Sequence, residues 1–291
     1  MLIHNHQLNP TQLSELDALY AACQIVDGSA PAHYPHLLAQ PREKNNLLCY
    51  THQQLIGFLG VYSFYSDACE ISLLVHPEHR HQGVARELLK TILPQLILKP
   101  IQRIVFSTPP SINDTWLSNV GCLYEESEYQ MIRSSTQLEP IKTNHLTINK
   151  ATRATIKTLC DIDAACFPGH PISPPSQFIQ WLNNPDYHLF IAEIEDQIIG
   201  KAHIRREKEV AYLSDIAILP DFQKQGFGSE LLTKMINEAL QLGARELLLD
   251  VATHNTSNAV NLYLRHGFKI LLQHDFWSIS MGHLKHIVGS V

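Results

Sequence analysis

The chain has 291 residues, of which 45% are hydrophobic, and 22 Lys and Arg residues stand against 28 Asp and Glu residues, a formal net charge of −6. This length fits two domains of ordinary size, each with enough apolar residues for its own core. Because the basic residues are spread without a run, the composition argues against a surface that follows a nucleic-acid backbone.

The sequence also limits the environment and the metal chemistry. It contains no apolar run as long as a membrane span, and its first residues lack a basic region followed by a hydrophobic one. We therefore expect a cytoplasmic protein without a membrane partner. The six cysteines have no Cys-x-x-Cys spacing and the 17 histidines no His-Glu-x-x-His cluster. Buried free thiols and no metal are expected, while nothing in the sequence specifies an oligomeric state.

Apolar periodicity and turn signals predict an α/β order in the first half of the chain. Pro94 should end or kink the helix that contains it, and the polar stretch 134–144, which contains Pro140, is the expected linker. The expected elements are a helix over 11–23, two strands within 47–65, a strand over 69–75, a helix from 84, a strand over 101–106, a short helix over 115–119 and a hairpin-like pair within 123–133.

The second half is expected to follow a similar order. Four prolines and a glycine forbid regular structure in the loop 166–175, and Gly243 is placed to stop a helix. The expected elements are a strand from Leu146, a helix over 153–165, a short helix around Phe178, strands over 189–194, 198–205 and 210–219, a helix containing 231–239, a strand over 247–251 and a helix through 263–266.

One motif is repeated at a constant separation. Residues 75–85 (Val-His-Pro-Glu-His-Arg-His-Gln-Gly-Val-Ala) align without a gap with residues 218–228 (Ile-Leu-Pro-Asp-Phe-Gln-Lys-Gln-Gly-Phe-Gly). Positions 77 and 220, 83 and 226, and 57 and 200 in an upstream motif are all 143 residues apart. We therefore expect two copies of one domain, 1–138 and 146–291, rather than a solenoid with a much shorter period.

The second copy of this motif has the properties of an anion cradle. An apolar strand ends at Pro220, and a loop with Gly226 and Gly228 runs directly into a helix. Glycines at these positions let backbone N–H groups and the positive end of the helix converge on one oxyanion. Dinucleotide folds and ordinary tight turns also use a strand, a turn and a helix with two glycines, so this pattern alone is not specific.

The residue sequence of the loop is more specific than this general pattern. Gln-x-x-Gly-x-Gly after a strand that ends in Pro resembles the acyl-CoA pyrophosphate loop of the GNAT superfamily of N-acetyltransferases. The resemblance covers nearly the whole chain at motif level. It implies an α/β fold (α+β, mixed sheet) with two tandem GNAT domains, as in mycothiol synthase, and a C-terminal half similar to the ribosomal-protein alanine N-acetyltransferases. It also implies acetyl-CoA as the acyl donor, bound by Ile216, Ile218, Gln223, Lys224, Gln225, Gly226, Phe227, Gly228 and Ser229.

Tyr263 is the candidate general acid. The segment Tyr263-x-x-x-Gly-Phe, preceded by Asn255, resembles the GNAT segment in which an Asn contacts the cofactor and a Tyr protonates the departing sulfur. Because the Asn-to-Tyr spacing is one residue longer than usual in the family, Asn255 and Asn258 compete for the cofactor contact. The alternative for Tyr263 is a ring that only packs against the sheet.

Asp250 is the candidate general base. It lies on the strand before the Asn turn, where the ribosomal-protein alanine N-acetyltransferases carry a Glu, and its shorter side chain calls for a bridging water. Asp215 and His254 are rival bases, and Tyr212 stands where other family members have a Glu. Each of these acids could equally be a solvated or capping residue.

The N-terminal copy keeps the cradle but not the acid. Arg80, Gln82, Gly83 and Ala85 occupy the cofactor-binding positions, whereas Leu117 stands where the tyrosine would be. Pro109-Pro110 replaces the asparagine turn. A cradle that still binds cofactor and a relic kept for folding are both open readings.

The resemblance implies an enzyme that acetylates a primary amine by direct attack, with its active site in the C-terminal domain and a degenerate N-terminal domain. The expected acceptor is an amine-bearing small molecule or a peptide N-terminus. Phe167-Pro168, Ser173 and Phe178 loosely resemble the Phe-Pro-Trp-Ser segment of peptide acetyltransferases, but an insertion replaces the Trp, so both acceptors stay open. The rival is a catalytically silent acyl-CoA-binding or sensor protein. The Asn and Tyr of the C-terminal copy favour the enzyme.

Overall fold

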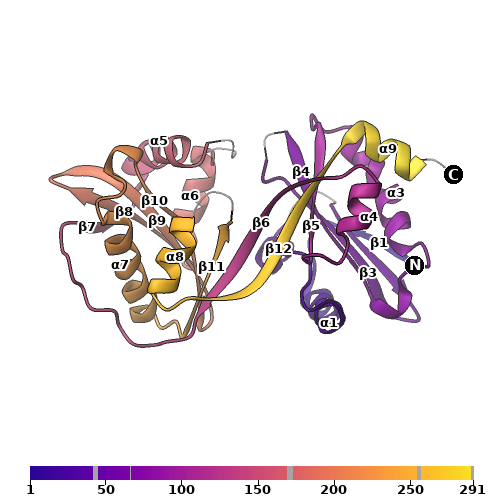
Figure 1. Ribbon diagram of the computed structural model, residues 1–291, viewed down its shortest axis with the longest axis horizontal. Coiled ribbons are helices and arrows are strands. Elements are labelled where there is room, and N and C mark those ends of the chain that lie inside the picture. Colours follow the sequence, from indigo (N-terminus) through magenta and orange to yellow (C-terminus); the bar gives the residue numbers. More distant parts are fainter. Residues whose placement is uncertain (42–44, 66, 169–172, 254–256, 290–291) are drawn as a thin grey trace. The chain divides into compact units, whose positions relative to one another are not determined.

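The computed structural model describes residues 1–41, 45–65, 67–168, 173–253 and 257–289, which pack as two compact units (Figure 1). Unit 1 consists of Met1–Glu128 together with Leu272–Val291, and unit 2 consists of Tyr129–Leu271. No helix in the described ranges combines the length and the apolarity that a bilayer crossing requires.

In unit 1, six strands of a mixed sheet follow one another in the order β1-β2-β3-β4-β5-β12. The pair β4 and β5 is parallel and the other neighbours are antiparallel. The last strand enters the unit at residue 272. The strands are β1 (Leu2–Asn5), β2 (Asn46–Thr51), β3 (Gln54–Tyr62), β4 (Ala68–Val75), β5 (Arg103–Thr108) and β12 (Lys269–Ser280).

Helices cover both faces of this sheet. On one face, α1 (Pro10–Asp27) and α2 (Pro35–Leu38) bury Leu16, Leu19 and Leu38 in one apolar cluster. A second cluster joins the opposite face to α3 (Val84–Ile97), α4 (Asp114–Asn119) and α9 (Met281–Gly289). A short 3₁₀ turn, η1 (Pro77–His79), leads from β4 to the loop before α3.

Unit 2 repeats the plan with the sheet order β7-β8-β9-β10-β11-β6, in which β10 and β11 form the parallel pair. The first strand along the chain, β6, enters the unit at residue 129. The strands are β6 (Leu123–Arg133), β7 (Thr147–Lys150), β8 (Tyr187–Ile194), β9 (Gln197–Glu207), β10 (Val210–Ile218) and β11 (Glu246–Ala252).

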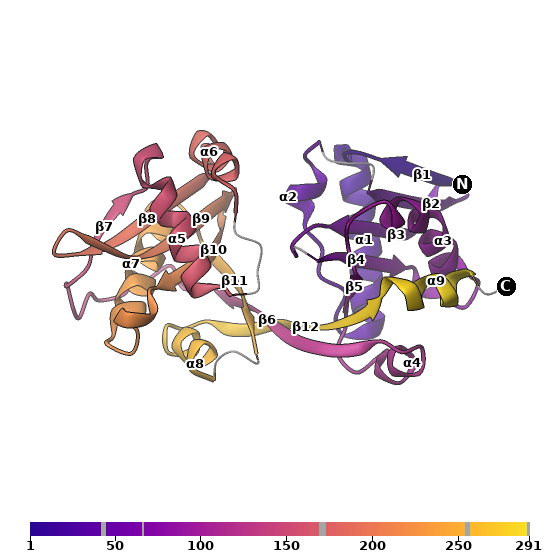
Figure 2. The same cartoon turned by 90° about the horizontal axis from the view of Figure 1, so that it is seen from above.

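Two pairs of helices enclose the sheet of unit 2 (Figure 2). The main core joins one face to α7 (Phe227–Gln241) and α8 (Ser257–Arg265). On the other face, α5 (Ile156–Cys166) and α6 (Pro175–Asn183) cover β8 and β9 around the fully buried Phe178. The 3₁₀ turns are η2 (Arg153–Thr155) and η3 (Pro220–Phe222).

The sixth strand of each sheet comes from the other sequence copy. In unit 1, residues Asp275–Ser280 of β12 pair antiparallel with Arg103–Thr108 of β5. In unit 2, the end of β6 takes the equivalent place beside β11, and Met131 is buried in the main core. The packed units therefore differ from the sequence ranges 1–138 and 146–291, because each unit borrows a strand from outside its own range.

One local expectation was wrong, and of the two outcomes expected at Pro94 the end of the helix does not occur there. Residues 123–133 form one strand rather than a hairpin-like pair, and they contain no Gly, Pro or Asn that would favour a tight turn. The helix α3 continues beyond Pro94 to Ile97. Its Leu88, Ile92 and Leu96 are all buried, so packing on both sides of the proline outweighs the local cost of about 3 kcal/mol.

Candidate active site

The cradle of unit 2 is formed where β10 ends, at η3 and the first turn of α7. Gly226 is the residue that caps α7, and its φ of +92° lies in the left-handed region that favours glycine. A Cβ at Gly226 or Gly228 would meet no atom of the described chain within 4 Å. The packing of the protein therefore does not require Gly228, and both glycines leave open space in front of the helix N-terminus.

Side chains of the loop stabilise the cradle by hydrogen bonds to backbone carbonyls of the preceding strand and turn. Gln223 donates from Nε2 to the Ile218 carbonyl at 2.8 Å, and Gln225 donates to the Asp221 carbonyl at 3.2 Å. Lys224 adopts a φ of +61°. Ile218 is buried in the main core, and Ile216 and Phe227 pack against it. The side chains of these predicted cofactor-binding residues thus shape the loop, and backbone groups are left to face a ligand.

The two parallel strands next to the cradle separate early. They pair only over Val210–Tyr212 and Glu246–Leu248. A bulge between Ser214 and Ala217 interrupts the pairing of β10 with β9, and Asp215 within it has a φ of +52°. A bulge bends its strand and leaves a residue unpaired in the ladder. The ends of β10 and β11 therefore diverge on the side where the cradle lies, and we call this opening the strand fork.

Tyr263 lies on α8, half-buried against the main core, with its ring 5.9 Å from that of Phe268. Burial raises the pKa of Tyr263 to about 12. The phenol therefore keeps its proton at neutral pH. Of the predicted residues before it, Asn255 and the rival base His254 lie outside the described residues, and Asn258 belongs to α8.

Asp250 lies on β11 between Leu249, which is buried in the main core, and Val251. Gln130 on β6 donates to its Oδ1 at 3.4 Å. The side chain is exposed, yet the surrounding protein removes enough water to raise the pKa of Asp250 to about 6, against a smaller opposing effect of Gln130 and Arg205. A carboxyl group with this pKa is mostly ionised at neutral pH and is well suited to accept a proton.

Sequence analysis missed a cluster of charged residues on the sheet face opposite α7. Lys201 of β9 is fully buried and forms ion pairs with Asp163 of α5 and with Asp215, the latter at 3.5 Å. His203 places Nδ1 3.2 Å from Asp215 Oδ2. The alternation of Lys201, His203 and Arg205 with the apolar residues Ala202 and Ile204 was the signal that could have revealed this cluster.

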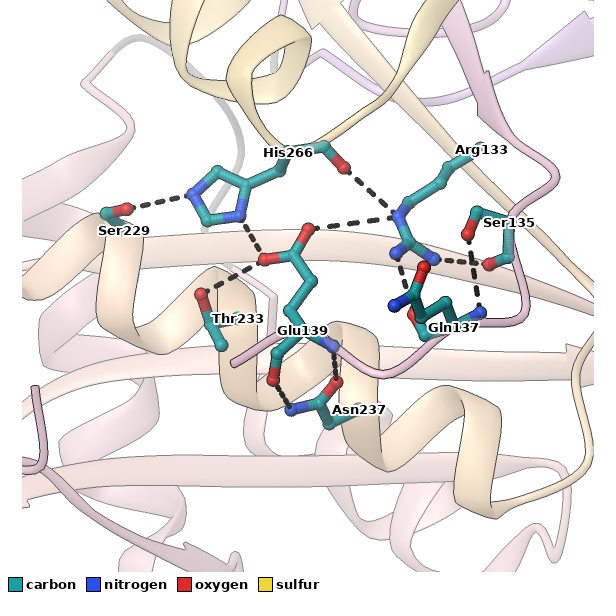
Figure 3. Close-up of polar contacts among 8 residues, drawn as sticks. All are labelled: Arg133, Ser135, Gln137, Glu139, Ser229, Thr233, Asn237 and His266. Carbon is teal, nitrogen blue, oxygen red and sulfur yellow. Dashed lines mark hydrogen bonds and ion pairs between the residues drawn. The ribbon is translucent and has the colours of Figure 1, made fainter. Parts of the chain in front are cut away.

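A second network missed by sequence analysis ties the expected linker to the cradle (Figure 3). His266 lies between two partners, with Nε2 2.8 Å from Ser229 Oγ and Nδ1 2.6 Å from Glu139 Oε2. Thr233 of α7 donates to the same carboxylate oxygen at 3.2 Å. The predicted cofactor residue Ser229 is therefore held in place from the side of α8.

The backbone of Glu139 is anchored as well. Its N–H donates to Asn237 Oδ1 at 2.8 Å, and its carbonyl accepts from Asn237 Nδ2 at 2.9 Å (Figure 3). Arg133 donates to the His266 carbonyl at 3.1 Å. The stretch 134–144, which was expected to be the linker, lies within unit 2, has no regular structure and is partly docked on α7. No feature of the sequence around Glu139 indicated this.

The cradle of unit 1 repeats the bracing of unit 2. Gly83 caps α3 with a φ of +84°, and a Cβ there would also meet no described atom within 4 Å. Arg80 donates to the Val75 carbonyl at 3.2 Å, and Gln82 donates to the Glu78 carbonyl at 3.0 Å, at positions equivalent to Gln223 and Gln225. Even a cysteine is repeated, because Cys23 and Cys166 each place Sγ against the carbonyl of the last strand residue, at 3.4 and 3.5 Å.

The surroundings of the two cradles differ. Arg80 forms a bidentate ion pair with Asp27 at 2.8 and 2.7 Å. The strands β4 and β5 stay paired as far as Ser72 and Ser107, without the bulge of β10. Leu117 is buried. Beside this cradle, a cavity of about 790 Å³ is lined largely by apolar side chains, among them Leu73, Leu89, Phe106, Trp116, Leu284 and Ile287.

Comparison with known proteins identifies the family to which the chain is similar. The model of the Acetyltransferase (GNAT) family matches residues 13–114 and 156–268, more than half of the chain. The chain is 38% identical over 87 residues to a [ribosomal protein bS18]-alanine N-acetyltransferase of Haemophilus influenzae, a match that covers 30% of the chain and 58% of that protein. It is 30% identical over 107 residues to the thialysine N-epsilon-acetyltransferase of Mus musculus, covering 32% and 62%. The chain thus spans less than two thirds of the length of these curated relatives.

Two solved structures match both units together. A GCN5-related N-acetyltransferase from Sphaerobacter thermophilus has a TM-score of 0.77 at 16% identity, with 96% of each chain covered. A tandem GNAT protein from the clavulanic acid biosynthesis pathway has a TM-score of 0.69 at 10% identity, with 97% of this chain and 98% of that chain covered. The predicted mixed-sheet α/β fold with two tandem GNAT domains is confirmed, and the chain belongs to the GNAT acetyltransferase family.

Proposed function

We propose that the protein is an acetyl-CoA-dependent N-acetyltransferase whose active site lies in unit 2, where it acetylates a primary amine by direct attack. The observation that carries the proposal is the meeting of an open cradle with a widening strand fork in that unit. The cradle leaves space in front of Gly226 and Gly228, and the bulge at Asp215 opens β10 away from β11.

The pyrophosphate of acetyl-CoA would lie against the backbone amides of residues 223–229. This fits the structure, since the side chains of Gln223 and Gln225 are engaged behind the loop and leave its amides to the ligand. Ser229, fixed by His266, would border the phosphates. Bound acetyl-CoA supplies a thioester carbonyl that an amine can attack, and either Asn255 or Asn258 would contact it near α8.

Two ionisable residues have the protonation states that the reaction needs. Asp250, whose pKa is about 6, is ionised at neutral pH and would take a proton from the acceptor ammonium, directly or through water. The neutral nitrogen then attacks the thioester carbon, so that a C–N bond forms and the C–S bond breaks. Tyr263, whose pKa is about 12, gives its proton to the departing sulfur. The second N–H proton lost as the amide forms returns to Tyr263 through solvent.

The relatives support an amine acceptor, because both curated proteins are named as N-acetyltransferases, one acting on a ribosomal-protein alanine and one on thialysine. We propose a small amine or a peptide N-terminus for this chain. No nucleic-acid partner is proposed.

In unit 1, we propose that Arg80, Gln82, Gly83 and Ala85 form a cradle that can hold an acyl-CoA without turnover. The cavity beside this cradle favours binding over a relic loop, whereas Leu117 offers no proton to a leaving thiolate. If unit 2 also lacked turnover, the protein would be a silent acyl-CoA sensor.

A screen of amines and peptides for CoA release from acetyl-CoA tests the proposal. We expect release with at least one primary amine and a matching acetylated product by mass spectrometry. Calorimetric binding of acetyl-CoA without release in the presence of any amine would instead favour the sensor.

A further inference from the structure

A histidine beside the cradle of unit 2 connects a carboxylate to a hydroxyl group (Figure 3). The imidazole of His266 has the Ser229 hydroxyl 2.8 Å from Nε2 and the Glu139 carboxylate 2.6 Å from Nδ1. The His266 side chain is 10% exposed and that of Glu139 is 16% exposed. In such a partly buried chain of polar groups, a change of charge on the imidazole changes the hydrogen bond that the hydroxyl makes.

The charged groups that face His266 come from two elements next to it. The Glu139 carboxylate, in the segment after β6, also accepts from Thr233 of α7 at 3.2 Å. Arg133 of β6 donates to the His266 carbonyl at 3.1 Å and places Nε 3.8 Å from Glu139 Oε1. Because the charges of Arg133 and Glu139 balance each other, a proton on His266 gives this group a net positive charge. An anion at the cradle would offset that charge.

The partners of the ring determine where the Ser229 hydroxyl hydrogen points. A carboxylate only accepts hydrogen bonds, so Nδ1 of His266 carries a hydrogen in both charge states of the ring. In the neutral ring, Nε2 has no hydrogen and accepts from the Ser229 hydroxyl. In the protonated ring, Nε2 donates to Ser229 Oγ instead. The hydroxyl hydrogen of Ser229 is then available to another acceptor.

Ser229 lies within reach of a ligand in the cradle. It is the third residue of α7, and helical side chains lean toward the N-terminus of their helix, here toward the open space at Gly226. The Ser229 N–H bonds to the Gly226 carbonyl at 3.1 Å, so the hydroxyl is the donor that this residue can commit fully to a ligand. The residue at the equivalent position of unit 1, Arg86, lines the cavity beside the cradle of that unit.

The two copies place different donors at this position. In unit 1, Arg86 carries a permanent positive charge. In unit 2, the position holds Ser229 in contact with His266. Val120 stands in unit 1 where His266 stands in unit 2, since each directly precedes the glycine after its helix. The positive charge at this side of the cradle is therefore fixed in unit 1 and depends on a proton in unit 2.

From these contacts we infer that cofactor binding by unit 2 takes up a proton on His266, and that the Ser229 hydroxyl then donates to a phosphate oxygen. This requires the pyrophosphate in the cradle of unit 2 and so rests on the proposed function. One proton comes from solvent and binds Nε2. Ser229 keeps its own hydrogen, which turns from Nε2 to the phosphate. Ser229 is thus a binding residue, while His266 and Glu139 are positioning residues that act through it.

The proton on His266 makes the cofactor affinity depend on pH. Bound phosphate favours the protonated ring, so the affinity is highest where the ring is already protonated and falls as the pH rises. Where the ring stays neutral even with ligand bound, the affinity levels off at a lower value. Histidine side chains ordinarily change their charge between about pH 5 and 8, and the dependence is expected in that interval.

Titration calorimetry of the full chain with 3′-dephospho-CoA tests this coupling. The ligand has a pyrophosphate but no phosphate monoester, so it exchanges no proton of its own near neutral pH. Measurements in buffers with different ionisation enthalpies give the number of protons taken up. We expect net uptake by the wild type between about pH 5 and 8, and an affinity that falls as the pH rises.

Histidine variants assign the proton to one residue. His266→Gln, which has no titratable ring, should bind the ligand without uptake. His188→Gln, on β8 and outside the network, should behave as the wild type. All residues of the network belong to unit 2, so ligand bound in unit 1 does not mask the effect of His266→Gln.

Variants of Ser229 distinguish a donor to the ligand from a contact that only holds α8 against α7. Ser229→Ala should weaken binding by about tenfold or more, as for a lost hydrogen bond to a charged group, and reduce the uptake. Ser229→Thr keeps a hydroxyl and should retain both properties. Glu139→Gln removes the carboxylate that favours the protonated ring, so uptake should occur only at lower pH. Circular dichroism checks that each variant is folded.

Several results would overturn the inference. These are binding by the wild type without proton uptake anywhere from about pH 5 to 8, uptake that persists in folded His266→Gln, and unchanged affinity in Ser229→Ala. If His266→Gln does not fold, the contrast between Ser229→Ala and Ser229→Thr decides. A wild type that does not bind the ligand would refute the cofactor site of unit 2 and the inference together. Uptake that depends on His266, without acetylation of any amine, would leave the inference standing and refute the proposed enzyme.

Discussion

The two cradles of this chain have nearly the same local structure in different surroundings. Each has a glycine cap in the left-handed region, a side chain that donates to the last strand carbonyl, and a glutamine that donates to the turn before it. All these contacts lie within about eight residues of the loop or reach back to one strand end. A loop of this kind is specified locally by its proline, its glycines and its side-chain hydrogen bonds to backbone carbonyls. It can therefore keep its conformation whether or not the site around it is catalytically active.

The surroundings determine what each cradle can do. In unit 2 the bulge of β10 opens the sheet and Tyr263 lies on the following helix, whereas in unit 1 the strands remain paired and Leu117 is buried. Arg80 is engaged by Asp27, while Gln223 has no such ion pair to make. The two copies therefore share the phosphate loop. Unit 2, for which the chemistry is proposed, differs from unit 1 in the separation of β10 from β11 and in the proton donor Tyr263.

The largest effect is expected from valine at the glycine caps. Gly226→Val places a branched side chain where the pyrophosphate would lie, and we expect it to abolish acetyl transfer. Gly83→Val should leave transfer within a few-fold of wild type. The two positions are matched, since both have φ near +90° and open space around Cβ, so the strain on the fold is similar.

Steady-state rates and circular dichroism of both cap variants test this comparison. Gly228→Val is a further control, because its site in α7 has no left-handed backbone, and it should also weaken acetyl-CoA binding. Loss of activity in a folded Gly83→Val protein would place the working cofactor in unit 1.

Removing the phenol hydroxyl should have the next largest effect. Tyr263→Phe keeps the ring against Phe268 but cannot donate a proton, so kcat should fall by about 10² to 10⁴-fold while acetyl-CoA affinity is retained. Leu117→Met in unit 1, a volume-conserving change at the equivalent buried position, should leave kcat nearly unchanged. A loss of only about twofold in Tyr263→Phe would mean that another group protonates the sulfur.

Asp250 should produce a smaller effect with a characteristic pH dependence. As a base, it must be deprotonated, so kcat/KM should rise with pH through about 6 and then level off. Tyr263, with a pKa of about 12, adds no loss below about pH 10. Asp250→Asn should lower kcat by about 10²-fold and remove the inflection. An unchanged profile in Asp250→Asn would exclude it as the base.

The smallest effect on activity is expected at Arg80. Arg80→Gln gives unit 1 the residue of unit 2 and should keep the donation to the Val75 carbonyl, but it leaves the mostly buried Asp27 without its partner. We expect the free energy of unfolding to fall by about 1 to 3 kcal/mol, with acetyl transfer unchanged. Urea denaturation measures the first quantity. An unchanged stability would mean that the ion pair contributes nothing to unit 1.

Features of the fold could be predicted from the sequence where they depend on residues close together in the chain, and could not where they depend on contacts between distant residues. The repeat, both cradles and the mixed α/β order were predictable, because glycine, proline and apolar periodicity act within a few residues. The exchange of β6 and β12 was not, since the sequence of a strand carries no record of which neighbouring strand it will join. The docking of Glu139 on Asn237 also joins residues nearly 100 positions apart.

Within the candidate site, the limits were similar. Asp250, Asp215 and Tyr263 were identified from their places along strands and a helix. Lys201 and Asp163 were not, because a buried lysine reads as a surface residue until its partners on another element are known. The alternation of Lys201, His203 and Arg205 with Ala202 and Ile204 was a local sign of that cluster.

Hydrogen–deuterium exchange with and without acetyl-CoA tests most directly which unit holds the working cofactor. The proposed site requires bound pyrophosphate to accept hydrogen bonds from the amides of 223–229, so exchange across 223–232 should slow on binding and the slowing should be lost in Gly226→Val. Additional protection over 80–89 would mean that unit 1 binds as well. Protection confined to 80–89, with 223–232 unchanged, would contradict the assignment of the active site to unit 2.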